Sequence, residues 1–175
     1  GIARNWLDRG DRAQDPFAKF FFYFTGFNAL YFLWKQVDDV EGGDQKQIAS
    51  LVSKFGDDKA AEMLCHMKDS LDYFSERDSI MEMRERTLSN PERGDQRAGR
   101  KWRSILRNSG EAACKQIDAM AQILYLVRSN LFHGSKEESG DDEKVIGMSV
   151  GPLRVILSYT IDLSEALQKR TGQQL

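Results

Sequence analysis

An arginine and a histidine lie five residues apart in the segment LVRSNLFHGSK, residues 126–136. Arg128 is permanently cationic and can grip a phosphate through two parallel hydrogen bonds, and His133 can exchange protons near neutral pH. Cleavage of RNA through its own 2′-hydroxyl needs a group that takes the hydroxyl proton, a group that protonates the leaving 5′-oxygen, and a cation on the phosphorane. The pair therefore predicts phosphodiester cleavage that uses no metal and no cofactor.

One histidine supplies only one of the two proton transfers. On an ideal helix Arg128 and His133 also point about 140° apart, so a single chain does not obviously bring them together. A two-fold symmetric homodimer with this helix end at its seam would supply two copies of each residue to one cleft. We therefore expect a homodimer with a composite site, or an unwinding of the helix at Gly134.

The helix that carries the motif has the most regular pattern in the chain, beginning at about Glu111. Its apolar residues advance by alternating threes and fours, which keeps them on one helical face. That face comprises Ala113, Ile117, Met120, Leu124, Val127 and Leu131. A second, adjacent face comprises Ile123, Leu126, Asn130 and His133. Because a monomer would leave the second face exposed, we expect that face to form the dimer seam.

The remaining sequence also predicts helices, and no segment favours a strand. Asp15 and Pro16 are typical of a helix start, and the aromatic helix that they begin, residues 17–37, should lie at the centre of the fold. Periodicity predicts further helices over residues 45–55, 57–74 and 95–108, and a last helix that ends near residue 170. Pro152 either kinks that last helix or marks its start. Loops are expected over residues 89–94 and over the acidic residues 136–144.

The composition fits one soluble, all-α domain over residues 1–175, with 41% hydrophobic residues and a net charge of −2. That charge neither supports nor excludes RNA binding. Cys65 and Cys114 lie too far apart for a zinc or disulfide pattern, and residues 1–12 lack the apolar core of a secretory signal, so we expect a cytoplasmic protein. The most apolar stretch, residues 17–34, is interrupted by polar residues, and we expect no membrane span.

Three other groups of residues have two interpretations each. A basic cluster could track an RNA backbone or form a solvated helix face; it comprises Arg93, Arg97, Arg100, Lys101, Arg103 and Arg107, with Trp102 among them. Cys65 and His66 suggest a nucleophile, but adjacent helical residues diverge, and a packed core pair is the better interpretation. Asn28 favours a structural hydrogen bond over ligand binding.

The pattern of arginine, four residues and histidine in RSNLFH resembles the motif of HEPN ribonucleases. Residues 27–31, FNALY, look like the aromatic first helix of that family. The resemblance covers about residues 6–167 and implies an up-and-down antiparallel helical bundle, a homodimer, and metal-independent endoribonuclease activity with Arg128 and His133 as catalytic residues. Such proteins often serve in toxin and antiphage systems, so an antitoxin is an expected partner besides RNA.

The chain departs from the family pattern directly after the arginine. The family commonly has Asn, Asp or His there, whereas this chain has Ser129 followed by Asn130. Either residue, or Lys136 beyond the Gly134 stop, is a candidate for the supporting polar role. The alternative function is a non-catalytic helical module that binds nucleotide, RNA or a partner protein through the same cleft.

Overall fold

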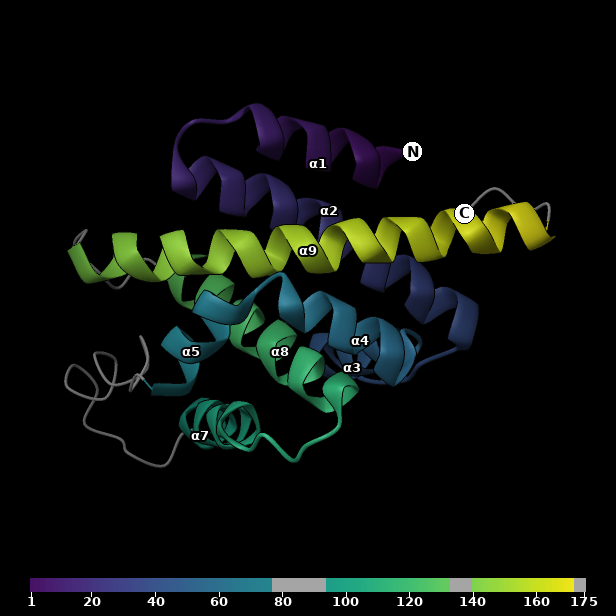
Figure 1. Cartoon of the computed structure of the whole chain (residues 1–175). Helices are drawn as coiled ribbons and strands as arrows, with labels where there is room; N and C mark the ends of the chain where they lie inside the picture. The colour runs from purple at the N-terminus through teal and green to yellow at the C-terminus, as the bar shows by residue number, and fades with distance from the viewer. Residues whose placement is uncertain (77–93, 133–139, 172–175) are drawn as a thin grey trace.

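The computed structural model describes residues 1–76, 94–132 and 140–171, except for the side chains of residues 94–98, 130, 132, 140–142 and 171. These residues form eight α-helices and no strand, so the all-α expectation is confirmed. The helices are α1 Ile2–Arg12, α2 Pro16–Asp38, α3 Asp44–Ser53, α4 Gly56–Cys65, α5 Lys68–Glu76, α7 Gly94–Arg107, α8 Ala113–Phe132 and α9 Gly140–Thr171. Figure 1 shows α9 crossing the molecule, with α1 on one side of it, α3, α4, α5 and α7 on the other, and α2 passing behind it.

Helix α2 begins and ends where the sequence predicts. The Asp15 carboxylate accepts a hydrogen bond of 2.7 Å from the backbone N–H of Ala18, and Pro16 occupies the first turn. The helix stops where Asp39 adopts a left-handed conformation, with φ 53°. Its buried side chains are mostly aromatic: Phe20, Tyr23, Phe24, Phe27, Leu30, Tyr31 and Trp34. Helix α2 therefore has the central position expected of it.

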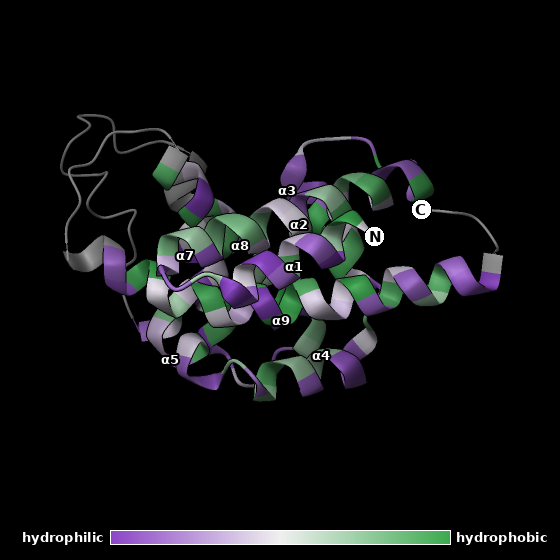
Figure 2. Cartoon of the chain, turned by 90° about the horizontal axis from the view of Figure 1, so that it is seen from above, coloured by the Kyte–Doolittle hydropathy of each residue, from purple (hydrophilic) through white to green (hydrophobic). Residues whose placement is uncertain are grey.

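One hydrophobic core draws side chains from every described helix. Figure 2 shows apolar segments gathered where α2, α8 and α9 meet, whereas the C-terminal turns of α9 project beyond the other helices and are mostly hydrophilic. The helices predicted over residues 45–55, 95–108 and 111–133 appear as α3, α7 and α8, each starting within two residues of its expected start. The expected loop over residues 89–94 lies outside the described residues, apart from Gly94, which begins α7.

The sequence did not reveal helix α1. Its charged composition hides a narrow apolar face, on which Ala3, Leu7 and Gly10 are buried against α2. A Cβ atom at Gly10 would lie 2.2 Å from the Tyr23 ring, so this close approach of the two helices requires glycine. Apolar contact with α2 therefore stabilises a helix whose overall composition is polar.

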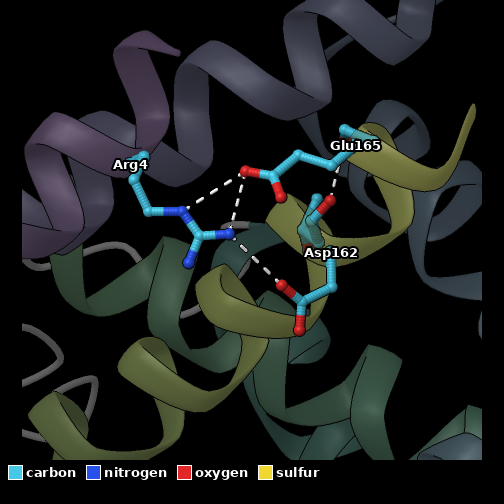
Figure 3. Close-up of polar contacts among 5 residues, drawn as sticks. Arg4, Asp162 and Glu165 are labelled. Carbon is cyan, nitrogen blue, oxygen red and sulfur yellow. Dashed lines mark hydrogen bonds and ion pairs between the residues drawn. The ribbon is translucent and has the colours of Figure 1, made fainter. Parts of the chain in front are cut away.

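Polar contacts join α1 to α9, the first helix to the last. Arg4 donates to the Glu165 carboxylate at 2.8 Å and lies 3.4 Å from that of Asp162 (Figure 3). Asp11 accepts hydrogen bonds from Arg154 at 2.7 and 2.9 Å and from the Tyr23 hydroxyl at 2.7 Å. The hydrogen bond from Arg154 is the main cause that lowers the pKa of Asp11. Such exposed pairs add little stability, so their main effect is to fix how α1 lies on α9.

Helix α9 corrects two expectations about the C-terminal part. Pro152 lies inside this helix and does not mark its start. Residues 140–144, expected to be loop, belong to its first turns, whereas residues 136–139 lie outside the described part. The acidic residues there favour the helix because carboxylates near a helix N-terminus interact well with its dipole.

Helix α9 is also the one described helix that is long and apolar enough to cross a membrane. Half of its most apolar window is buried inside the fold. Core helices of soluble proteins pass the same test, so this property assigns no membrane role.

The helix predicted over residues 57–74 is divided into α4 and α5. Backbone N–H groups of His66 and Met67 bond to carbonyls three residues back, which tightens and ends α4. Cys65 and His66 are both exposed, so the expectation of a packed core pair was wrong. The buried positions of this segment, Ala60, Met63 and Met67, follow helical spacing and leave Cys65 and His66 on the outer face.

Candidate functional site

Arg128 lies one turn before the end of α8 and contacts α2. Its side chain is half-buried, and its guanidinium carbon lies 5.7 Å from the centroid of the Phe24 ring. A cation over an aromatic face is attracted by the ring quadrupole. The arginine of the motif is therefore seated against the aromatic helix and has a defined neighbour on its apolar side.

Two residues of the FNALY segment, Tyr31 and Asn28, are joined by a hydrogen bond. Tyr31 is 1% exposed, and its hydroxyl donates a hydrogen bond to the Asn28 side-chain oxygen. Asn28 itself is exposed, but its hydrogen bond agrees with the structural role expected for it. Burial is the main cause that raises the pKa of Tyr31, and the Arg128 guanidinium acts in the opposite direction.

Tyr31, Tyr125, Asp44 and Arg128 form one electrostatic group, called here the arginine cluster. Burial is the main cause that raises the pKa of both tyrosines, and the Asp44 carboxylate raises it further, whereas Arg128 lowers it. The four residues belong to three helices, α2, α3 and α8.

The arginine cluster has the chemistry of an anion site. Both tyrosines are protonated near neutral pH, as tyrosines ordinarily are, and burial raises their pKa values further. Arg128 remains a cation with a planar set of donors that matches two oxygens of a phosphate. The half-exposed guanidinium can therefore bind a phosphate group while its other side rests against the Phe24 ring.

The structure describes only some of the other residues expected at the site. Ser129 is half-buried, and its hydrogen bond slightly lowers the pKa of Tyr125. His133 and Lys136 lie outside the described residues, and the side chain of Asn130 is not described. The meeting of Arg128 with His133 thus stays a prediction.

The second apolar face of α8 does not form an exposed seam. Ile123 is 5% and Leu126 is 7% exposed within the single chain. The expectation that a monomer would leave this face open was wrong for Ile123 and Leu126, because neighbouring helices of the same chain cover both sides of α8. The other two residues of this face, Asn130 and His133, are not described at the level of their side chains.

The basic cluster on α7 lies near an earlier part of α8 than the one that carries Arg128. Lys101 acts electrostatically on Asp118, ten residues before Arg128, which is about 15 Å along the helix. Arg107 donates to the backbone oxygen of Ser75 and so links α7 to α5. Trp102 is half-buried against the core, which favours a packing role. The side chain of Arg97 is not described, and Arg93 lies outside the described residues.

If α7 guides RNA, the double variant Arg100→Glu with Arg103→Glu should weaken RNA binding at low salt about tenfold or more. It should also make the affinity less dependent on salt concentration, since RNA binding then releases fewer counterions. Fluorescence anisotropy with a labelled RNA measures both quantities. The matched control carries Lys68→Glu and Arg170→Glu, which make the same charge change at exposed positions on α5 and α9. Equal affinities in the two double variants would remove α7 from RNA binding.

Sequence reasoning did not single out Tyr31, Tyr125 and Asp44 as residues near Arg128. Tyr125 precedes Arg128 by three residues, a spacing that puts both side chains on one helical side, so this signal was present. Tyr31 belongs to the FNALY segment, which the sequence analysis did identify. Asp44 carried no signal beyond that of an acidic residue at a helix start.

No protein-family model, curated protein or solved structure is significantly similar to this chain.

Proposed function

We propose that this protein is a metal-independent endoribonuclease of the HEPN type, which works as a homodimer. One observation carries the proposal: the two segments that resemble the family, FNALY and RSNLFH, lie about one hundred residues apart in sequence, yet Arg128 of RSNLFH lies over the Phe24 ring, whose centroid is 6.3 Å from that of Phe27 in FNALY. The all-α fold supports the same proposal.

In this proposal Arg128 binds the scissile phosphate and stabilises the charge that develops on it. His133 of one protomer takes the 2′-hydroxyl proton, and its copy in the partner protonates the leaving 5′-oxygen. The 2′-oxygen attacks phosphorus, the bond to the 5′-oxygen breaks, and a 2′,3′-cyclic phosphate results. Arg128 suits this role because its guanidinium already lies over the Phe24 ring before any RNA binds. A cation that is preorganised in this way costs no reorganisation during the reaction.

The exposed side of α2 replaces the second face of α8 as the proposed dimer seam. Phe21 is 46% and Phe32 is 53% exposed, and with Asn28 they lie on one side of an ideal helix, next to Phe24 and Tyr31. Large exposed aromatic side chains that share a face are typical of interaction surfaces. A second copy seated there would bring its own Arg128 close to the first.

Phe21→Asp with Phe32→Asp should convert the dimer into a 20 kDa monomer and abolish cleavage, since a charge at the centre of an apolar seam is left unpaired. Light scattering at micromolar concentration measures the mass. The control is Val37→Asp: Val37 is 45% exposed but lies about 140° around α2 from Phe32. A wild type that is monomeric under these conditions would contradict the dimer.

The experiment that tests the function is an RNA-cleavage assay with purified protein in excess chelator. Cleavage that the Arg128→Ala variant lacks supports the ribonuclease. Binding of RNA or nucleotide without cleavage would leave the non-catalytic module as the function.

A further inference from the structure

Helix α7 has a strong local charge that the rest of the chain does not share. Its 14 residues carry five cations and one carboxylate, a net charge of +4, in a chain whose net charge is −2. Figure 1 shows α7 at the edge of the molecule opposite α1. Soluble surfaces ordinarily intersperse charges of both signs. A helix at the edge of the fold that is rich in one sign is therefore a candidate for binding an anion.

The cations of α7 lie mainly on its outward side. Leu106 is 9% exposed, and Trp102 and Ile105 pack against the core, so these three residues define the inward side. On an ideal helix the opposite side spans about 100°. It is called here the basic face and comprises Arg100, Arg103, Ser104 and Arg107. Arg103 is half-buried, and the other three residues are exposed.

Contacts within the protein hold two cations of α7 in place. The Nε–H of Arg107 donates to the backbone oxygen of Ser75, which uses one of the five N–H donors of a guanidinium. At the margin of the basic face, the Lys101 ammonium lies 4.5 Å from the centroid of the Trp102 ring. Side chains that are already held lose less entropy when a ligand binds. These contacts therefore favour binding.

The basic face fits the phosphates of a nucleic acid strand better than it fits a protein surface. Protein interfaces usually have an apolar centre, whereas the one residue of the basic face that is not an arginine is Ser104. Each guanidinium can bind two phosphate oxygens at once. The arginines extend over about 10 Å along the helix axis, from Arg100 to Arg107, as a row suited to a linear polyanion.

We infer that the basic face of α7 is a second RNA-binding site, which holds phosphates of the strand at a distance from the bond that is cut. The choice of RNA as the ligand rests on the proposed ribonuclease function. Because the phosphates of all four nucleotides are alike, this site contributes affinity without reading sequence.

The distance between α7 and Arg128 sets the length of RNA that can use both sites. Gln116, in the first turn of α8, donates a hydrogen bond of 3.0 Å to the backbone oxygen of Asn108, the residue after α7. Arg128 lies twelve residues beyond Gln116, which is about 18 Å along the helix. A stacked strand advances about 3.4 Å per nucleotide, so it needs about five nucleotides or more to cover this distance.

A charge series at Ser104 tests the basic face without removing any arginine. For a 2′-O-methyl RNA of about 20 nucleotides, Ser104→Arg should raise the affinity about threefold and Ser104→Glu should lower it about threefold. The methylated strand cannot be cut through its 2′-hydroxyl, so fluorescence anisotropy measures binding alone. The matched control is the same pair of changes at Ser53, an exposed serine on α3, which should leave the affinity unchanged.

The length of the substrate gives a second test. Ser104→Glu should raise the KM of a cleavable RNA of about 20 nucleotides about threefold and leave kcat unchanged, because the lost contact is the same in the ground and transition states. The kcat/KM of a dinucleotide should not change, since a dinucleotide at Arg128 is too short to reach α7. Steady-state kinetics with both substrates measure these quantities.

The outcomes separate this inference from the function on which it rests. Equal affinities across the Ser104 series, or the same effects at Ser53, would overturn the second site, as would an equal effect of Ser104→Glu on the dinucleotide. Polyglutamate that competes as strongly as RNA of equal charge would assign the basic face to an acidic protein segment instead. If the wild type fails to cleave RNA, the ribonuclease is overturned, whereas the binding series still decides whether α7 binds RNA.

Discussion

An RNA substrate that lacks the 2′-hydroxyl at its cut site should not be cleaved at all, while the same RNA with the hydroxyl is cut in excess chelator. The reason is that the substrate supplies its own nucleophile and no metal-bound water replaces it. The products of the intact RNA should carry a 2′,3′-cyclic phosphate and a free 5′-hydroxyl, which mass spectrometry distinguishes by mass.

A binding control keeps this result interpretable. The substituted RNA should bind as tightly as the intact one, because in the proposed mechanism Arg128 binds phosphate and not the sugar hydroxyl. Cleavage that needs magnesium, or that continues without the 2′-hydroxyl, would contradict the proposed chemistry.

Arg128→Ala and His133→Ala should each lower the cleavage rate about a hundredfold or more, the usual effect of losing a preorganised cation or a proton-transfer group. Arg128→Lys should also be impaired, because lysine keeps the charge but loses the planar fork. Single-turnover rates with saturating protein measure the loss, and thermal unfolding confirms that each variant is folded.

The chain contains a matched control for each change. His66 is the other histidine and is exposed at the end of α4, so His66→Ala should keep full activity. Arg9 on α1 also stacks over an aromatic ring, that of Trp6, at 5.1 Å. Arg9→Ala therefore removes the same kind of contact away from α8, and a comparable loss of activity there would count against a specific role for Arg128.

Local patterns predicted the elements of this fold well. The Asp15 cap, the aromatic run of α2 and the regular spacing of α8 are determined within one segment, and the helices that they predict were confirmed. Helix α1 was missed because its few apolar residues make sense only against the Tyr23 ring that covers Gly10. The break after Cys65 was missed for a similar reason, since helical periodicity continues from Met63 to Met67 across it.

The candidate site was predictable only in part, because its residues come from three separate segments. Arg128 was recognisable from its own neighbours in sequence, whereas Asp44 becomes relevant only when α3 packs on α8. The error about the second face of α8 has the same origin. Helical periodicity places the apolar Leu126 on one face of α8, but it does not show which helix covers that face.

The contacts between α1 and α9 have a consequence for the order in which the fold is completed. Arg4 pairs with Glu165, and Asp11 with Arg154, so these contacts form only after α9 has been synthesised. Contacts between residues so distant in sequence also form slowly. A nascent chain that still lacks α9 thus lacks the finished bundle, and we expect the proposed ribonuclease to stay inactive until α9 has been made.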